Sequence, residues 1–107
     1  MKRSERATQI WAVLAWIARN RQSVTYSQLD ALTGIPRAGL GRMLEPIQSY
    51  CANTSLPPLT ILVVQQESGL PGSGFTGASA AQFAKAQMEV FEYDWLEHGN
   101  PQPHAFE

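Results

Sequence analysis

Residues 24–42, VTYSQLDALTGIPRAGLGR, have the pattern of two short helices joined by a tight turn. Thr25 or Ser27 can cap the first helix with a side-chain oxygen, and Gly34 permits the left-handed backbone that commonly ends a helix. Pro36 suits the first turn of the next helix, because its φ is already helical and its missing N–H would have no partner there. This pattern predicts a helix-turn-helix.

Four side chains on these two helices suggest how the motif is used. Leu29 and Leu32 give the first helix an apolar stripe that can pack on a core. Arg37 begins the second helix, and Arg42 follows about one and a half turns later. Since arginines on the second helix of such a motif can reach the groove or the phosphates of a duplex, DNA is the first partner to consider.

The residues around the motif predict an α+β, mainly α, fold. A strand, a glycine turn and a second strand follow the helices, and this order is typical of a winged helix-turn-helix with a small β-hairpin. An additional amphipathic C-terminal helix comes after the hairpin. The further elements expected are helices over residues 4–20, 37–43, 47–52 and 80–98, a strand over 60–66 and a return strand from 72 to 75.

Residues 1–98 are expected to form a single winged-helix-like domain, and residues 99–107, which contain two prolines, an extended and mobile tail. Trp11 and Trp16 widen the apolar face of the N-terminal helix and are expected to pack in the core. The apolar side of the last helix would close over the N-terminal helix in a monomer, or pair with its counterpart in a homodimer.

Val24–Tyr26 and Gly34–Ala38 look like the helix-turn-helix entry of the alkylguanine-DNA alkyltransferases and their catalytically inactive alkyltransferase-like relatives. In that family the tyrosine contacts the DNA backbone near a flipped nucleotide, and the arginine opening the second helix enters the base stack from the minor groove. The resemblance places these two roles on Tyr26 and Arg37. One departure is that the family's Arg-Ala-Val-Gly becomes RAGLG at residues 37–41.

Downstream, residues 56–64, LPPLTILVV, and Gly72–Phe75 resemble the family's Pro-rich active-site strand and its glycine-aromatic hairpin. Where the enzymes carry Pro-Cys-His-Arg, residues 57–60 of this chain read PPLT, so the nucleophilic thiolate and its activating histidine are both missing. A pocket for a flipped base could therefore bind the base without accepting its alkyl group. The expected DNA-binding residues are Thr25, Tyr26, Ser27, Arg37, Arg42, Gly72 and Ser73, and the expected pocket residues are Pro57, Pro58 and Phe75.

The charge of the chain is −1 in total but is unevenly distributed. Residues 1–53 hold seven basic and three acidic side chains, whereas residues 54–107 hold one basic and six acidic side chains. A polyanion could dock on the N-terminal half while the acidic C-terminal half faces away or weakens non-specific binding. Ordinary scatter of surface charge would give the same asymmetry without any partner.

Other reactive side chains lack the neighbours that chemistry requires. Cys51 has neither histidine close in sequence, so a small buried apolar residue is expected rather than a nucleophile. His98 and His104 have no metal-ligand spacing, and the glycine-rich residues 69–75 lack the Lys-Ser/Thr of a phosphate loop. No metal, no cofactor and no catalytic residue are predicted.

The sequence also suggests a cellular setting. It contains no apolar run of the roughly 18 residues that a membrane span requires, a single cysteine and no secretion signal near its start. A cytoplasmic, bacterial-type protein is therefore expected.

The function expected from all these features is that of a non-catalytic DNA-binding winged-helix protein. The leading alternative is a protein-interaction or small-ligand-binding module on the same scaffold that assembles through its C-terminal helix. Its support is the low overall charge, since dedicated DNA-binding domains are usually more basic. An enzyme with a substituted active site is the third and weakest reading.

Overall fold

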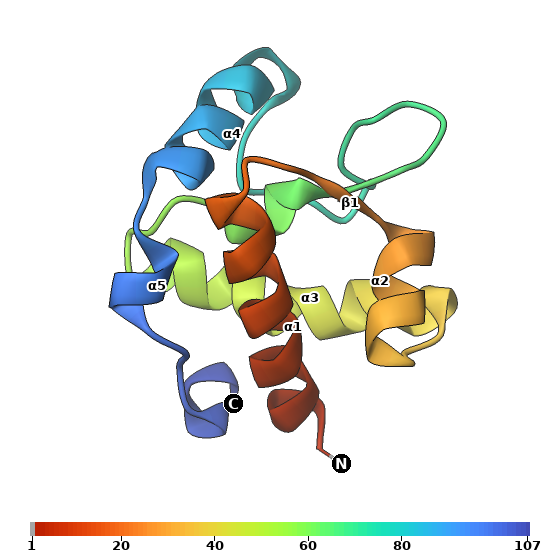
Figure 1. Ribbon diagram of the computed structural model, residues 1–107, viewed down its shortest axis with the longest axis vertical. Helices are drawn as coiled ribbons and strands as arrows, with labels where there is room; N and C mark the ends of the chain where they lie inside the picture. The colour runs from red at the N-terminus through yellow and green to blue at the C-terminus, as the bar shows by residue number, and fades with distance from the viewer. Residues whose placement is uncertain (1) are drawn as a thin grey trace.

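Helices surround a two-stranded parallel sheet in the computed structural model, which describes residues 2–107 (Figure 1). None of the helices described is both long and apolar enough to cross a membrane. The α-helices, strands and 3₁₀ helices (η) follow in the order α1 (Arg3–Arg19), β1 (Val24–Thr25), α2 (Tyr26–Thr33), α3 (Arg37–Asn53), η1 (Leu59–Leu62), β2 (Val63–Val64), η2 (Ala80–Gln82), α4 (Phe83–Glu92), α5 (Trp95–His98) and η3 (Pro103–Phe106).

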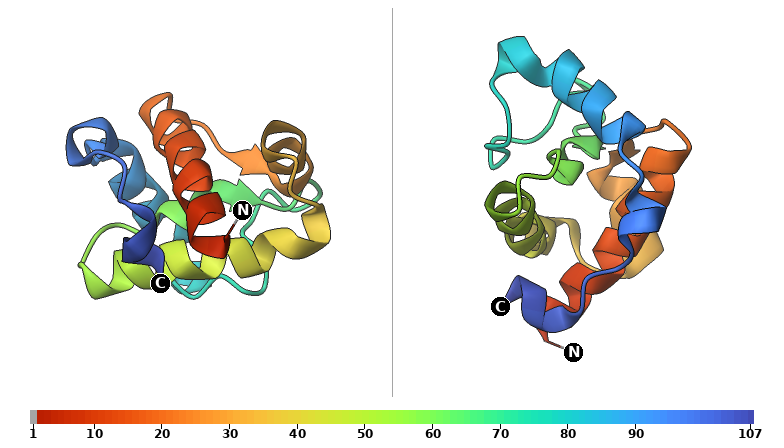
Figure 2. Two further views of the ribbon diagram at one scale, coloured as in Figure 1. Left: turned by 90° about the horizontal axis from the view of Figure 1, so that it is seen from below. Right: turned by 90° about the vertical axis from the view of Figure 1, so that its left-hand side faces the viewer.

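The core lies where α1 crosses α3 at the centre of the molecule (Figures 1 and 2). Each helix has buried residues at three- and four-residue spacing, so each presents one apolar face to the other. The 3₁₀ helix η1 lies against both of them and against α4. The side chains that are fully buried there include Ile10, Trp11 and Leu14 of α1, Leu40 and Ile47 of α3, and Leu59 and Leu62 of η1.

The helix α3 is continuous through Pro46, where two separate helices had been expected. A proline inside a helix has no N–H to donate to the carbonyl four residues earlier, here that of Arg42. The guanidinium of Arg3 takes over this role, because its Nε and Nη2 donate to the Arg42 carbonyl at 2.8 and 2.6 Å. A residue from α1 thus satisfies the carbonyl that Pro46 leaves without an intrahelical partner.

The local signals for α2 and its turn are confirmed. The Thr25 hydroxyl accepts from the Gln28 amide N–H at 3.1 Å, and the Gln28 side chain accepts from the Thr25 N–H at 2.9 Å. These reciprocal bonds form a capping box. Gly34 ends the helix with φ of +75°. Pro36 lies immediately before α3 with an extended ψ of 140°, and not in the first turn of the helix as expected.

The expected β-hairpin is reduced to a single bridge. Residues 59–62 form a 3₁₀ helix, and the strand β2 pairs in parallel with β1, in the register Val24 to Val63. Towards the following loop, Val64 makes only an isolated antiparallel bridge to Pro71. Proline cannot extend a ladder, and the glycines after it have low strand propensity, so the return strand expected over residues 72–75 does not form.

The C-terminal helix expected over residues 80–98 is divided into η2, α4 and α5. Tyr93 is extended, with ψ of 138°, and Asp94 caps α5 by accepting from the Glu97 N–H at 3.1 Å. This break turns Trp95 into the core, where its indole packs edge-on against Trp11 at 5.4 Å between ring centroids. Its Nε1–H donates to the Val90 carbonyl at 2.7 Å.

Residues 99–107 are packed on the domain, in contrast to the expected extended tail. They run alongside α1 (Figure 2), and the Asn100 side chain donates to the Thr8 carbonyl at 3.1 Å. Phe106 is buried, and its ring lies 5.5 Å from that of Tyr50 and 6.0 Å from that of Trp11. The burial of Phe106 therefore keeps this segment on the domain, although its two prolines had suggested a mobile tail.

Two apolar residues expected in the core are exposed. Trp16 lies roughly 140° around α1 from Trp11 by helical geometry, and 61% of its surface is accessible. Leu32 of α2 is 64% exposed, whereas Leu29 is fully buried. The apolar stripes of both helices are thus narrower than the sequence suggested.

Phe106→Ala should lower the free energy of unfolding by about 3 kcal/mol, because it removes a buried aromatic ring and leaves a cavity against Trp11 and Tyr50. Urea denaturation followed by tryptophan fluorescence would measure this. The matched control Leu32→Ala changes an exposed side chain and should cost no more than about 0.5 kcal/mol. Equal, small effects of both substitutions would contradict the packing of residues 99–107.

Candidate functional site

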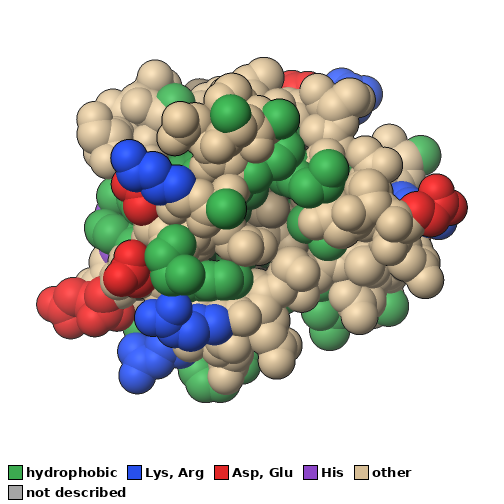
Figure 3. All heavy atoms as spheres, turned by 90° about the horizontal axis from the view of Figure 1, so that it is seen from above, with side chains coloured by type: hydrophobic (Ala, Val, Ile, Leu, Met, Phe, Trp, Pro, Cys, Tyr) green, Lys and Arg blue, Asp and Glu red, His purple; other side chains and the backbone are tan. Residues whose placement is uncertain are grey.

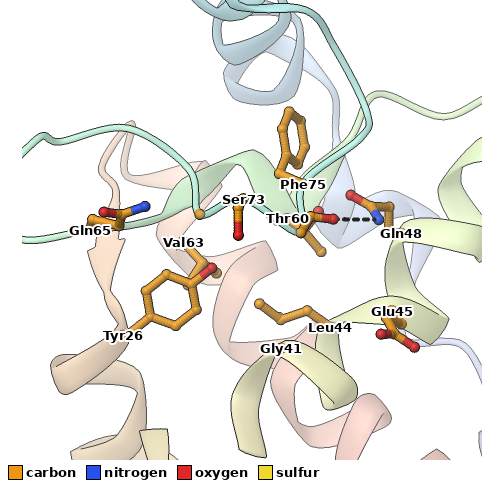
Figure 4. A pocket seen from close by; sticks show the side chains of 12 residues that line it. Tyr26, Gly41, Leu44, Glu45, Gln48, Thr60, Val63, Gln65, Ser73 and Phe75 are labelled. Atoms are coloured by element: carbon orange, nitrogen blue, oxygen red, sulfur yellow. Dashed lines mark hydrogen bonds between the residues drawn. The ribbon is translucent and has the colours of Figure 1, made fainter. Parts of the chain in front are cut away.

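A cavity of about 400 Å³ lies between α3, the start of α2 and the loop that follows β2 (Figure 4). Its size falls in the range of small-ligand sites. Both of the buried segments η1 and β2 contribute to its wall. The lining residues are Tyr26 from α2, Gly41, Leu44, Glu45 and Gln48 from α3, Thr60 and Val63, and Gln65 and residues 72–75 from the loop.

Tyr26 forms one wall of this cavity and depends on a glycine opposite it. A Cβ atom at Gly72 would stand 2.6 Å from the Tyr26 hydroxyl oxygen, which is closer than real contacts allow. A side chain at position 72 would therefore push the Tyr26 ring out of its present place. Gly72 and Ser73 were expected on a β-hairpin wing, and the structure instead places them on the cavity.

Thr60 brings a buried hydroxyl to the same cavity. The residue is 5% exposed, and its Oγ1 has no hydrogen-bond partner within residues 2–107. A buried hydroxyl without a partner typically costs about 1 to 3 kcal/mol, so few are found in native proteins. The unpaired Thr60 hydroxyl is therefore expected to lower the stability of the fold at the cavity wall.

Gln48 ties the loop to α3 with both ends of its side-chain amide. Its Nε2 donates to the Gly74 carbonyl at 3.3 Å, and its Oε1 accepts from the Thr76 N–H at 2.8 Å. Phe75 lies between these two anchored residues and lines the cavity (Figure 4). One side chain of α3 thus holds a segment of the cavity wall from both sides.

The two prolines expected to line a pocket are not on this cavity. Pro58 lines a separate hollow beside α4, and Pro57 lines neither. Pro58 and Phe75 instead both lie close to Gly77. A Cβ on Gly77 would meet the Pro58 Cβ at 2.6 Å and the Phe75 ring at 2.9 Å. Phe83 packs on the other side of Phe75, with ring centroids 5.8 Å apart. Of the three predicted pocket residues, only Phe75 reaches the cavity.

A second, shallower hollow lies at the α2 end of the molecule and brings together four of the predicted DNA-binding residues. Thr25, Tyr26, Ser27 and Arg37 line it. The remaining wall is the loop segment 65–67, which includes the carboxylate of Glu67. The cavity and the hollow adjoin, since Tyr26 and Gln65 line both.

The Arg37 side chain is exposed at the N-terminal end of α3. Within residues 2–107 the one ion pair joins Arg3 to Glu45 at 3.0 Å, so no carboxylate there lies within ion-pair distance of the Arg37 guanidinium. The Asp30 carboxylate instead accepts from the Arg37 backbone N–H at 3.2 Å. Arg37 is therefore presented to solvent as an unneutralised cation.

Arg42 is also exposed but belongs to neither hollow. Five residues separate it from Arg37, which by helical geometry turns the two side chains roughly 140° apart. Its backbone carbonyl is held by Arg3. The structure thus does not bring Arg37 and Arg42 to the same surface.

Charge is sparse on the face that carries α4 and the loop after β2. Figure 3 shows hydrophobic side chains gathered across the middle of this face and charged side chains near its edges. The described residues form no continuous basic surface there.

The side chains of Cys51 and His98 are engaged outside the cavity. Cys51 is buried as expected, and this burial raises the pKa of its thiol to about 11, although a backbone hydrogen bond with Leu59 acts in the opposite direction. The two ring nitrogens of His98 lie 3.2 Å from the Tyr50 hydroxyl and 3.1 Å from the Tyr93 hydroxyl. Within residues 2–107, no three acidic, histidine or cysteine side chains are close enough together to hold a metal ion.

Comparisons with protein-family models, with curated proteins and with solved structures found no match to this chain. The site is therefore interpreted from its own geometry. The site residues not predicted from the sequence include Gln48 and Thr60. Neither has a local sequence signal, because the role of each depends on a loop or cavity formed by distant residues.

The pKa of Cys51 makes a prediction about pH. The unfolded thiol loses its proton near pH 9.0, whereas the folded thiol keeps it to about 11. The free energy of unfolding should therefore fall as pH rises between these values. Cys51→Ala has no thiol to titrate, so its free energy of unfolding should lack this fall, and denaturation of both proteins at several pH values would measure the difference.

The burial of Cys51 also predicts its reactivity. At neutral pH a thiol reagent should modify the protein only after denaturation. Rapid modification of the folded protein would contradict this assignment.

Proposed function

We propose that this chain is a non-catalytic DNA-binding protein that contacts the duplex through the hollow at the start of α2 and α3. The observation that carries the proposal is the exposed Arg37 guanidinium, which stands beside the hydroxyl-bearing residues Thr25 and Ser27 without a carboxylate partner in the described chain. Guanidinium and hydroxyl groups are the commonest donors to DNA phosphates.

The backbone supports the same contact. Arg37 is the first residue of a 17-residue helix, and helix N-terminal ends carry a partial positive charge that favours phosphates. Glu67 and Asp30 lie close to this end and oppose an anion. We therefore expect weak or moderate affinity that depends strongly on salt, in keeping with the net charge of −1.

The adjoining cavity supports a second part of the proposal, that an extrahelical base can enter beside the contact. Tyr26 and Phe75 offer aromatic surfaces for stacking, and the exposed Gln65 offers an amide for the edge of a base. The cavity wall contains neither cysteine nor histidine. A base would therefore be bound and released without covalent transfer.

The cavity also supports a second candidate function, the binding of a small molecule in place of DNA. Its volume and its mixed aromatic and polar wall suit such a ligand as well as a base. Assembly through the C-terminal helix has less support, because α4 packs against η1 and α1. Only Met88 and Leu96 remain as large exposed apolar side chains of α4 and α5.

Arg37→Ala should weaken binding to a short duplex by about 1 to 3 kcal/mol if the side chain reads a base, and should reduce the salt slope by about one unit if it contacts a phosphate. Fluorescence anisotropy at two salt concentrations would measure both quantities. The matched control is Arg19→Ala, which removes an exposed arginine at the C-terminal end of α1, beside residues 91–96 and outside both the cavity and the Arg37 hollow.

The outcome of this titration separates the two candidate functions. Equal losses for both arginine substitutions would show that the interaction is unspecific electrostatics and would reject the Arg37 hollow. No duplex binding by the wild-type protein at low salt would reject DNA binding altogether and leave the small-ligand function.

A further inference from the structure

We propose that residues 72–76 form a strap over the cavity and that Gln48 is the positioning residue that holds this strap closed on a bound base. This inference rests on the proposed function for its ligand. The closure itself is a property of the protein alone, and it can be tested without DNA.

The strap depends on one side chain for its polar attachment to the helices. Within residues 2–107, the hydrogen bonds that join residues 72–76 to the rest of the fold are the two made by the Gln48 amide. The Phe75 N–H bonds to the Gly72 carbonyl, inside the strap itself. The nearest backbone pairing is the single bridge between Val64 and Pro71, just before the strap, and no ladder continues through residues 72–76.

The apolar contacts of the strap fix one end and leave the other adjustable. Phe75 packs on Phe83, and Gly77 fits closely against Pro58. Ser73 and Gly74, nearer the mouth of the cavity, are exposed. The two glycines at 72 and 74 make this part of the backbone easy to displace. Loss of the Gln48 amide should therefore loosen residues 72–74 and free the Thr76 N–H, while the packing of Phe75 on Phe83 and of Gly77 on Pro58 remains.

Gln48 acts on the cavity and not on the Arg37 hollow. It lines the cavity but is absent from the hollow formed by Thr25, Ser27 and Arg37. Opening of the strap should accordingly change how long an extrahelical base is retained, and should leave contacts with a fully paired duplex unchanged. This separation distinguishes a positioning role from a general effect on folding.

The experiment compares Gln48→Ala and Gln48→Met with the wild type. Gln87→Ala is the control, since it removes a half-buried glutamine from α4, away from the cavity. The first measurement is amide hydrogen exchange of Thr76 in the DNA-free protein. Loss of one hydrogen bond should accelerate this exchange by about five- to tenfold in both Gln48 variants and leave the control unchanged. Urea denaturation would confirm that each variant is folded.

The second measurement is the dissociation rate from two duplexes, one fully paired and one with a single bulged guanine. Both Gln48 variants should leave the bulged duplex about five- to tenfold faster than the wild type does, while rates for the paired duplex stay within about twofold. Gln48→Met should match Gln48→Ala, because it fills the same space without the amide.

Each outcome decides a separate point. Unchanged exchange at Thr76 would overturn the strap, whatever the DNA result. Faster exchange with unchanged dissociation from the bulged duplex would overturn the role of Gln48 in retention. If the wild-type protein bound neither duplex, the proposed function and the retention of a base would both fall, and the exchange rate alone would still show whether Gln48 closes the loop.

Discussion

The burial of six consecutive residues, Leu59–Val64, is the constraint on which the rest of the structure depends. The 3₁₀ helix η1 contacts α1, α3 and α4, and β2 pairs with β1 ahead of α2. Water is thus excluded from this segment, and α1, α2, α3 and α4 are positioned against it. A polar or smaller residue here would disturb several helix contacts at once. The same segment supplies Thr60 and Val63 to the cavity.

The site is a consequence of this packing. The β1–β2 pairing places the start of α2 next to β2, so that Tyr26 faces the loop that follows the buried segment. Tyr26 then separates a polar hollow with an exposed arginine from a cavity with aromatic and amide groups. In the function proposed above, the exposed cation would contact the duplex and the cavity would hold a displaced nucleotide. The carboxylate of Glu67 at the same hollow would limit non-specific binding.

The sequence predicted the parts of the fold that local chemistry determines. The Thr25 cap, the left-handed Gly34 and the start of α3 follow from short-range rules, and they are confirmed. The errors arose where contacts between distant residues determine the local structure. Arg3 donates to the Arg42 carbonyl that Pro46 leaves without an intrahelical partner, so α3 continues through Pro46. Burial of Phe106 holds residues 99–107 against the domain. Of the cavity residues, the family resemblance predicted only Phe75 for a pocket, whereas it predicted Tyr26 for contact with the DNA backbone. Gln48 and Thr60 could not be predicted, because their roles exist only once the loop and η1 are in place.

The central claim is that DNA meets the protein at the joined hollow and cavity around Tyr26. Titration of isotope-labelled protein with a short duplex, followed by backbone amide chemical shifts, tests this most directly. The account predicts the largest changes at Thr25–Ser27, at Arg37 and in residues 65–67, with smaller changes along residues 72–76. Changes confined to α4, α5 and residues 99–107, or no changes at low salt, would contradict it.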